Sequence, residues 1–255
     1  MDFMKTTRLL TLFLAFLFSI GSAYAQASTI AVAANMKDAF NEIAIAFKAG
    51  GRPEMRVVYG SSGNFATQTM NGAPFNLFIA ADEQFPLELF RNGKTTDDGE
   101  IYAIGKLAII TKNSSGIRLL DSKVDIAKAI GKANKVAIAK PELAPYGRAA
   151  VQYLKAEGLW DLAKDKLVYA DNIGAATTYV VSGAADIGFT ALSLAKSPEV
   201  MKQTSFILVD AKLYEPIKQR MVLIKGAPQE SVDLYRFMQG PQAKSILQKY
   251  GYTTP

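Results

Sequence analysis

The polar turn Gly60-Ser61-Ser62-Gly63 is the stretch of this sequence whose residue types could do chemistry. It follows an apolar strand pattern and precedes a helical pattern that begins at Phe65. The first backbone N–H groups of a helix have no partner within the helix and carry the positive end of its dipole. Two hydroxyls between glycines add donors and allow close approach to the backbone. The turn could therefore bind a small anion, although such turns more often serve only as helix caps.

The sequence contains no histidine and no cysteine. These absences exclude the Ser-His-Asp triad, most catalytic zinc sites, zinc–thiolate sites and a cysteine nucleophile. A hydrolase could use the Ser61-Ser62 turn as its nucleophile, but no lysine stands three residues after either serine to activate it. We therefore expect a protein that is not an enzyme and that needs no cofactor or resident metal.

The N-terminus has the pattern of a signal peptide. Lys5 and Arg8 precede an apolar run from Leu9 to Ile20, and Ala23-Tyr24-Ala25 offers small residues at the two positions that a signal peptidase reads. The run is short for a membrane span, so a retained anchor is the weaker alternative. The pattern predicts a signal peptide over residues 1–25, cleavage after Ala25 and export of the mature protein. The net charge of +6 is mild, and we expect no nucleic-acid partner.

Short apolar stretches alternate with helical patterns along the rest of the chain. Strands are predicted at 29–33, 56–59, 77–82, 105–111, 135–139, 167–170, 187–190, 206–209 and 221–224, and helices at 65–71, 83–91, 125–130, 148–157, 175–181, 230–238 and 242–250. A further helix follows Asn35, which we expect to be its N-cap. This alternation predicts an α/β fold with ligands at the carboxyl ends of the strands.

Several ordered stretches resemble periplasmic molybdate-binding proteins. They are Ala33-Ala34-Asn35-Met36-Lys37-Asp38-Ala39-Phe40, Tyr59-Gly60-Ser61-Ser62-Gly63, Gly72 to Asp82, Pro145-Tyr146-Gly147, Asp171-Asn172-Ile173 and Gly240 to Tyr252. They occur in the order and spacing of that family, and the chain resembles it along nearly its whole mature length.

The resemblance implies a two-lobed periplasmic-binding-protein fold of type II. Each lobe would be a mainly parallel sheet flanked by helices, with the ligand in the cleft between them. The chain would cross near Leu107 and return near Gln219, so that residues 26–107 and 219–255 form lobe 1 and residues 108–218 form lobe 2.

The same resemblance implies a function in transport. The protein would be a monomer that captures molybdate or tungstate and delivers it to the membrane permease of an ABC transporter. Two alternatives stay open: a binder of sulfate or phosphate on the same fold, and a periplasmic structural protein with no transport role.

Four residues are carried over from the family as ligand-binding groups. Asn35 and Ser62 would supply donors from the first lobe, and Tyr146 and Ile173 would supply main-chain N–H groups from the second. A site built from such donors needs no charged side chain if several helix termini converge. It favours a fully deprotonated oxyanion, because a protonated phosphate would have no acceptor for its O–H.

The sequence departs from the family at two positions. Ala34 stands where some relatives carry a hydroxyl, and Ala191 stands where some use a tyrosine hydroxyl. One donor is therefore unassigned, and Ser61 or Thr190 could replace it.

Overall fold

The computed structural model describes residues 27–52 and 54–255. The predicted signal peptide and its cleavage after Ala25 lie outside these residues. Within this part of the chain, no helix combines the length and the apolar character that crossing a membrane requires.

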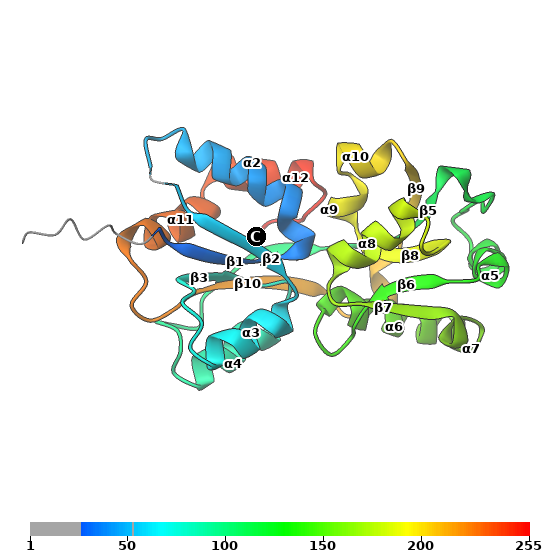
Figure 1. Cartoon of the computed structure of the whole chain (residues 1–255), viewed down its shortest axis with the longest axis horizontal. Coiled ribbons are helices and arrows are strands. Elements are labelled where there is room, and N and C mark those ends of the chain that lie inside the picture. The colour runs from blue at the N-terminus through cyan, green and yellow to red at the C-terminus, as the bar shows by residue number, and fades with distance from the viewer. Residues whose placement is uncertain (1–26, 53) are drawn as a thin grey trace, which may run out of the picture.

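Two five-stranded sheets form the two halves of the molecule (Figure 1). The first has the order β2-β1-β3-β10-β4, with bounds Arg56–Gly60, Thr29–Ala33, Leu77–Ile79, Ile217–Leu223 and Glu100–Gly105. The second has the order β7-β6-β8-β5-β9, with bounds Leu167–Ala170, Val136–Ala139, Ile187–Ala191, Leu107–Lys112 and Thr204–Leu208. The type II periplasmic-binding-protein fold predicted from the resemblance is confirmed.

Both sheets are mixed, with one reversed strand each. β10 is antiparallel to β3 and β4, and β5 is antiparallel to β8 and β9, whereas the remaining pairs are parallel. The reversed strands are those that the chain enters directly after passing from one sheet to the other. They start at the edge where the other strands end, so they must run the opposite way.

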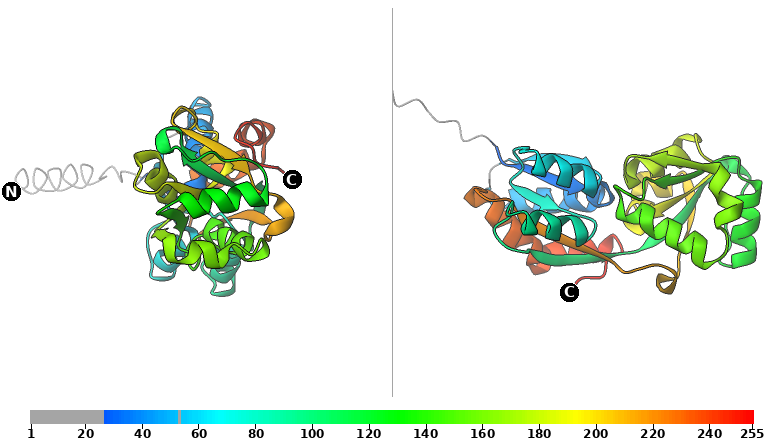
Figure 2. Two further views of the ribbon diagram at one scale, coloured as in Figure 1. Left: turned by 90° about the vertical axis from the view of Figure 1, so that its right-hand side faces the viewer. Right: turned by 90° about the horizontal axis from the view of Figure 1, so that it is seen from below.

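The chain passes between the sheets twice. Only Lys106 separates β4 from β5, and residues 209–216 lead from β9 back to β10. In Figure 2 these two connections run along the same side of the molecule, and β4 pairs with β10 there. The lobe bounds at 107 and 219 remain a prediction.

Helices cover both faces of each sheet. Their bounds are α2 Lys37–Lys48, α3 Ser62–Met70, α4 Gln84–Arg91, α5 Lys123–Lys132, α6 Pro145–Ala156, α7 Trp160–Ala163, α8 Ile173–Ser182, α9 Leu192–Ala195, α10 Pro198–Met201, α11 Gln229–Gln239 and α12 Pro241–Lys249, with short 3₁₀ turns η1 Ala34–Met36, η2 Asn113–Ser115, η3 Lys164–Lys166 and η4 Ala211–Leu213. On the first sheet, α2, α11 and α12 lie on one face and α3 and α4 on the other (Figure 1).

Three helices begin earlier than their apolar patterns predict. α3, α6 and α8 start at Ser62, Pro145 and Ile173 rather than at Phe65, Arg148 and Ala175. The first turn of α3 is small and polar, and those of α6 and α8 combine one large residue, Tyr146 or Ile173, with proline or glycine, so apolar periodicity does not detect them. Because the helices begin earlier, three of the expected ligand-binding residues, Ser62, Tyr146 and Ile173, lie at helix N-termini.

Two other predictions are corrected by the structure. Asn35 is not an N-cap, because it lies within η1, and α2 begins at Lys37 with no side-chain cap. The strand predicted at 105–111 is two strands, since β4 ends at Gly105 and β5 begins at Leu107. The pattern of β4 was missed because only Ile101 to Ile104 are apolar within it.

Candidate functional site

The carboxyl ends of strands from both sheets meet around a small cavity. It is lined by Ala33, Ala34, Asn35, Gly60, Ser61, Ser62, Ala81, Ala144, Pro145, Tyr146, Asn172 and Ile173. None of these side chains is charged. The volume open to the centre of a water molecule is about 10 Å³, which corresponds to roughly one water. A larger ligand therefore requires the walls to separate.

The N-terminus of α3 brings two serine hydroxyls to the cavity. Ser62 Oγ accepts a hydrogen bond from Ala81 N at 2.9 Å, so its own proton is free to be donated. Ser61 is the N-cap residue, but its side chain makes no capping bond. Its Oγ is buried and has no partner among the described residues. Both hydroxyls can therefore donate to a ligand.

Two further helix N-termini face the cavity from the second half of the molecule. Pro145 is the first residue of α6 and has no N–H, so Tyr146 supplies the first free N–H of that helix. Asn172 caps α8 by accepting from Ala175 N at 2.9 Å, which leaves the N–H of Ile173 free. Neither the Tyr146 N–H nor the Ile173 N–H has an acceptor in the described part of the chain.

Asn35 lies between the cavity and a buried polar cluster. Its Nδ2 lies 2.9 Å from Gln219 Oε1 and 2.8 Å from Tyr252 Oη. Its Oδ1 is buried and has no partner among the described residues. Asn35 is 1% exposed. One end of its amide is therefore held by the buried cluster, and the other end has no hydrogen-bond partner among the described residues.

The structure brings six of the seven predicted residues to one cavity and leaves one apart. Ala34, Asn35, Ser61, Ser62, Tyr146 and Ile173 all line it. Thr190 does not; its Oγ1 lies 2.6 Å from Thr177 Oγ1 in a buried pair. Of the two replacements considered for the missing donor, Ser61 therefore has the free hydroxyl. The ligand-binding roles of these residues remain predictions.

The Tyr146 phenol points away from its own N–H. Tyr146 Oη lies 3.0 Å from the end of the Gln219 side-chain amide, and a Cβ on Gly105 would collide with this hydroxyl. Burial raises the pKa of the Tyr146 and Tyr102 phenols well above the usual value, so both remain neutral. The phenol therefore contacts the paired strands β4 and β10, at Gly105 and Gln219, and not the position expected for the ligand.

Sequence reasoning missed the residues behind the cavity. Gln219 and Tyr252 stand on β10 and near the C-terminus, far along the chain from Asn35. Neither occupies a strand-to-helix junction, so no local signal marks them. Asn172 could have been found, because an asparagine directly before a helix is a common cap.

Several contacts bridge the two halves beside the cavity. Gly63 N donates to Leu143 O at 2.9 Å, and Ser193 Oγ donates to Asn35 O at 2.8 Å. The Arg148 guanidinium on α6 forms an ion pair with Asp82, which follows β3.

The carboxyl of Asp82 is largely withdrawn from water. Burial raises its pKa above the usual 3.8, and the adjacent Arg148 guanidinium opposes this shift without cancelling it. The Asp82–Arg148 pair can form only when the two halves are close together.

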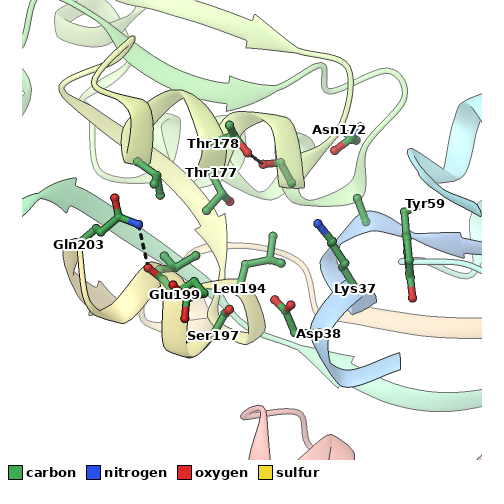
Figure 3. A pocket seen from close by; sticks show the side chains of 14 residues that line it. Lys37, Asp38, Tyr59, Asn172, Thr177, Thr178, Leu194, Ser197, Glu199 and Gln203 are labelled. Atoms are coloured by element: carbon green, nitrogen blue, oxygen red, sulfur yellow. Dashed lines mark hydrogen bonds between the residues drawn. The ribbon is translucent and has the colours of Figure 1, made fainter. Parts of the chain in front are cut away.

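A larger cleft opens on one side of the cavity and shares Ala34 and Asn172 with it. It has a volume of about 400 Å³. Figure 3 shows Lys37, Asp38 and Tyr59 on one side of it and Thr177, Thr178 and Glu199 among the side chains opposite. It carries charges of both signs and none of the free helix N-terminal donors described above, so the small cavity is the candidate site.

The chain is similar to known solute-binding proteins over most of its length. The family model for bacterial extracellular solute-binding proteins matches residues 28–253. The molybdate-binding protein ModA of Azotobacter vinelandii is 35% identical over 237 residues, which cover 91% of each chain. ModA of Rhodobacter capsulatus is 34% identical, over 88% of this chain and 87% of its own.

Solved structures show the same arrangement. The periplasmic molybdate-binding protein of Azotobacter vinelandii superposes with a TM-score of 0.80 at 32% identity, over 89% of this chain and 99% of that chain. The sulfate-binding protein SubI of Mycobacterium tuberculosis has a TM-score of 0.72 at 15% identity, over 89% and 86% of the two chains. The second likeness concerns the fold alone.

Proposed function

The chain belongs to the bacterial extracellular solute-binding proteins, and from this premise we propose that it captures molybdate or tungstate for an ABC importer. The family is one of solute-binding proteins rather than enzymes. Relatives at 35% and 34% identity that are named as molybdate-binding proteins support the choice of ligand.

The observation that carries this proposal is the convergence of neutral donors on one cavity. The N-termini of α3, α6 and α8 face it, together with the hydroxyls of Ser61 and Ser62. Each helix terminus contributes a partial positive charge, and hydrogen bonds to an anion are stronger than neutral ones. No carboxylate lines the cavity, so a dianion meets no repulsion there.

The donor set also favours one class of anion. Hydrogen phosphate carries an O–H that needs an acceptor, and leaving it unpaired in a buried site costs about 1–3 kcal/mol. Molybdate and tungstate carry no proton near neutral pH and resemble each other in charge and shape. We therefore assign both to the site ahead of phosphate.

The remaining parts of the proposal follow from this function. The mature protein would act in the periplasm as a monomer, without a cofactor, and would pass its ligand to the membrane permease of the transporter. The N-terminal signal-peptide pattern supports export.

Calorimetry with molybdate, tungstate, sulfate and phosphate tests the assignment. We expect tight binding of molybdate and tungstate, with sulfate and phosphate weaker by at least about tenfold, or 1.4 kcal/mol. Equal affinity for sulfate would contradict the molybdate assignment and leave the fold intact. An absence of binding by all four anions would favour a structural role.

A further inference from the structure

Asn35 is held by a buried cluster in which Gln219 is the central residue. The Gln219 amide contacts Asn35, Tyr102 and Tyr146. All four side chains are at most 3% exposed. Because water is excluded, each proton and each acceptor in the cluster must find its partner inside it.

With the Gln219 amide oxygen toward Asn35, the protons do not balance. Tyr102 Oη lies 2.8 Å from Gln219 Oε1 and 2.9 Å from Ala80 O, which gives two acceptors for a single proton. Tyr146 Oη accepts from Gln219 Nε2, and its own proton has no acceptor among the described residues. Within the same part of the chain, Asn35 Oδ1 has no donor.

Turning both amides by half a turn restores the balance. This exchange of N and O leaves the shape of the cluster almost unchanged. Gln219 Nε2 then donates to Tyr102 and to Asn35 Oδ1, and Tyr102 donates its proton to the Ala80 carbonyl. The Tyr146 hydroxyl donates to Gln219 Oε1. Tyr252 Oη, which lies 2.8 Å from this end of Asn35, donates its proton to Asn35 Oδ1, and Ser193 Oγ donates to Asn35 O. The mismatches at Tyr102, Tyr146 and Asn35 are then removed, and the Asn35 N–H₂ group becomes the unpaired end.

We propose that Gln219 is a positioning residue that holds the Asn35 amide with its N–H₂ group toward the cavity. This inference rests on the proposed function, because it explains how that same site selects a deprotonated oxyanion. In the opposite orientation Asn35 would present an acceptor to the anion and would suit an anion that carries a proton. Gln219 touches no ligand and acts through Asn35.

The Gln219→Glu variant tests this role, because an ionised carboxylate can only accept. It would draw the Asn35 N–H₂ group inward and turn Oδ1 toward the cavity. The added charge weakens the binding of every dianion, so the informative quantity is the ratio of sulfate affinity to hydrogen phosphate affinity. Sulfate and phosphate are both dianions in the upper part of the pH range used, where the second ionisation of phosphate is complete.

We expect this ratio to be at least about tenfold lower in Gln219→Glu than in wild type. A tenfold change corresponds to the loss of one charge-assisted hydrogen bond from Asn35 to sulfate. The measurement runs from about pH 7.5 to 9.5, because burial raises the pKa of a new carboxyl. The phenols of Tyr102, Tyr146 and Tyr252 face it, and burial raises the pKa of each phenol, so all three stay protonated. The carboxylates of Asp82 and Asp38 in the first lobe further raise the pKa of Tyr102 and Tyr252, respectively. Both carboxylates are present in the wild type and in the variant, so their effect cancels in the comparison.

Gln219→Met is the matched control, since it has a similar length and no hydrogen-bonding group. It should weaken binding of sulfate and phosphate by similar factors and keep their ratio within about threefold of wild type. An equal fall of the ratio in both variants would overturn the proposal, because amide polarity would then be irrelevant. Unchanged apo unfolding temperatures show that each variant folds.

A second measurement needs no variant of Gln219. The side-chain amide protons of Asn35, identified by their loss in Asn35→Ser, should shift in the NMR spectrum when molybdate is added. The inference is overturned if the Asn35 amide resonances do not shift at saturating molybdate, or if Gln219→Glu leaves the ratio of sulfate affinity to hydrogen phosphate affinity unchanged. Neither result would contradict the proposed function. A wild-type protein that binds no oxyanion overturns both.

Discussion

Replacing the Ser62 hydroxyl is the sharpest test of which atoms hold the ligand. The hydroxyl accepts from Ala81 N at 2.9 Å, so its proton is available to an oxyanion. Ser62→Ala removes one charge-assisted hydrogen bond and should weaken molybdate binding by about 1.5–3 kcal/mol, a rise in Kd of about 10- to 150-fold. Calorimetry with molybdate measures this loss.

The same substitution affects the free protein. Without the hydroxyl, the buried N–H of Ala81 loses its acceptor, which costs about 1–3 kcal/mol of stability unless water replaces it. Ser61→Ala provides the matched control, because Ser61 Oγ has no partner among the described residues. Its removal should leave the apo unfolding free energy within about 0.5 kcal/mol of wild type.

Tyr146→Phe completes the comparison. The main-chain N–H survives, and the lost phenol contacts Gln219 rather than the expected ligand position. We therefore expect a smaller loss of affinity than in Ser62→Ala. If Tyr146→Phe loses as much as Ser62→Ala, the phenol is a direct ligand and the main-chain assignment is wrong.

Three further predictions concern the two halves of the molecule. We expect molybdate to close the lobes, because donors come from both of them; X-ray scattering should show compaction, and an unchanged radius at saturating ligand would contradict it. Gly63→Ala should weaken molybdate binding by about tenfold, since a Cβ there would lie 2.9 Å from Leu143 Cα and oppose closure; it would also lie 2.9 Å from Phe85 Cζ in the same half, so the apo protein should lose some stability as well, and wild-type affinity by calorimetry would refute the binding prediction. Asp82→Asn removes a carboxyl whose pKa is raised in the folded protein, so the folded state binds its proton more tightly than the unfolded chain. Wild type should therefore gain stability relative to this variant as the pH falls from the raised pKa toward 3.8; denaturant unfolding across that range checks it, and a pH-independent difference would argue against it.

Much of the architecture could be predicted from local patterns in the sequence. Apolar runs alternating with helical patterns indicated an α/β fold, and the strand at Leu167–Ala170 was located to the residue. The absence of histidine and cysteine by itself limited the chemistry that any site on this chain could perform. Local patterns succeed here because strand and helix periodicities are set by neighbouring residues.

Strand direction and the first turns of the helices required the structure. The reversal of β5 and β10 follows from where the chain crosses between sheets, and no residue within either strand encodes it. α3, α6 and α8 begin at Ser62, Pro145 and Ile173, and their first free N–H groups face a shared cavity. Apolar spacing along the chain carries no information about that surrounding.

Sequence resemblance named the candidate site residues, but only the tertiary structure decided how they are supported. Thr190 was a reasonable substitute donor by sequence, yet the fold pairs it with Thr177. No local pattern marked Gln219 as a support for the site, because its contact with Asn35 spans 184 positions of the chain. Its role depends on a proton balance among buried groups, and that balance exists only once packing has excluded water.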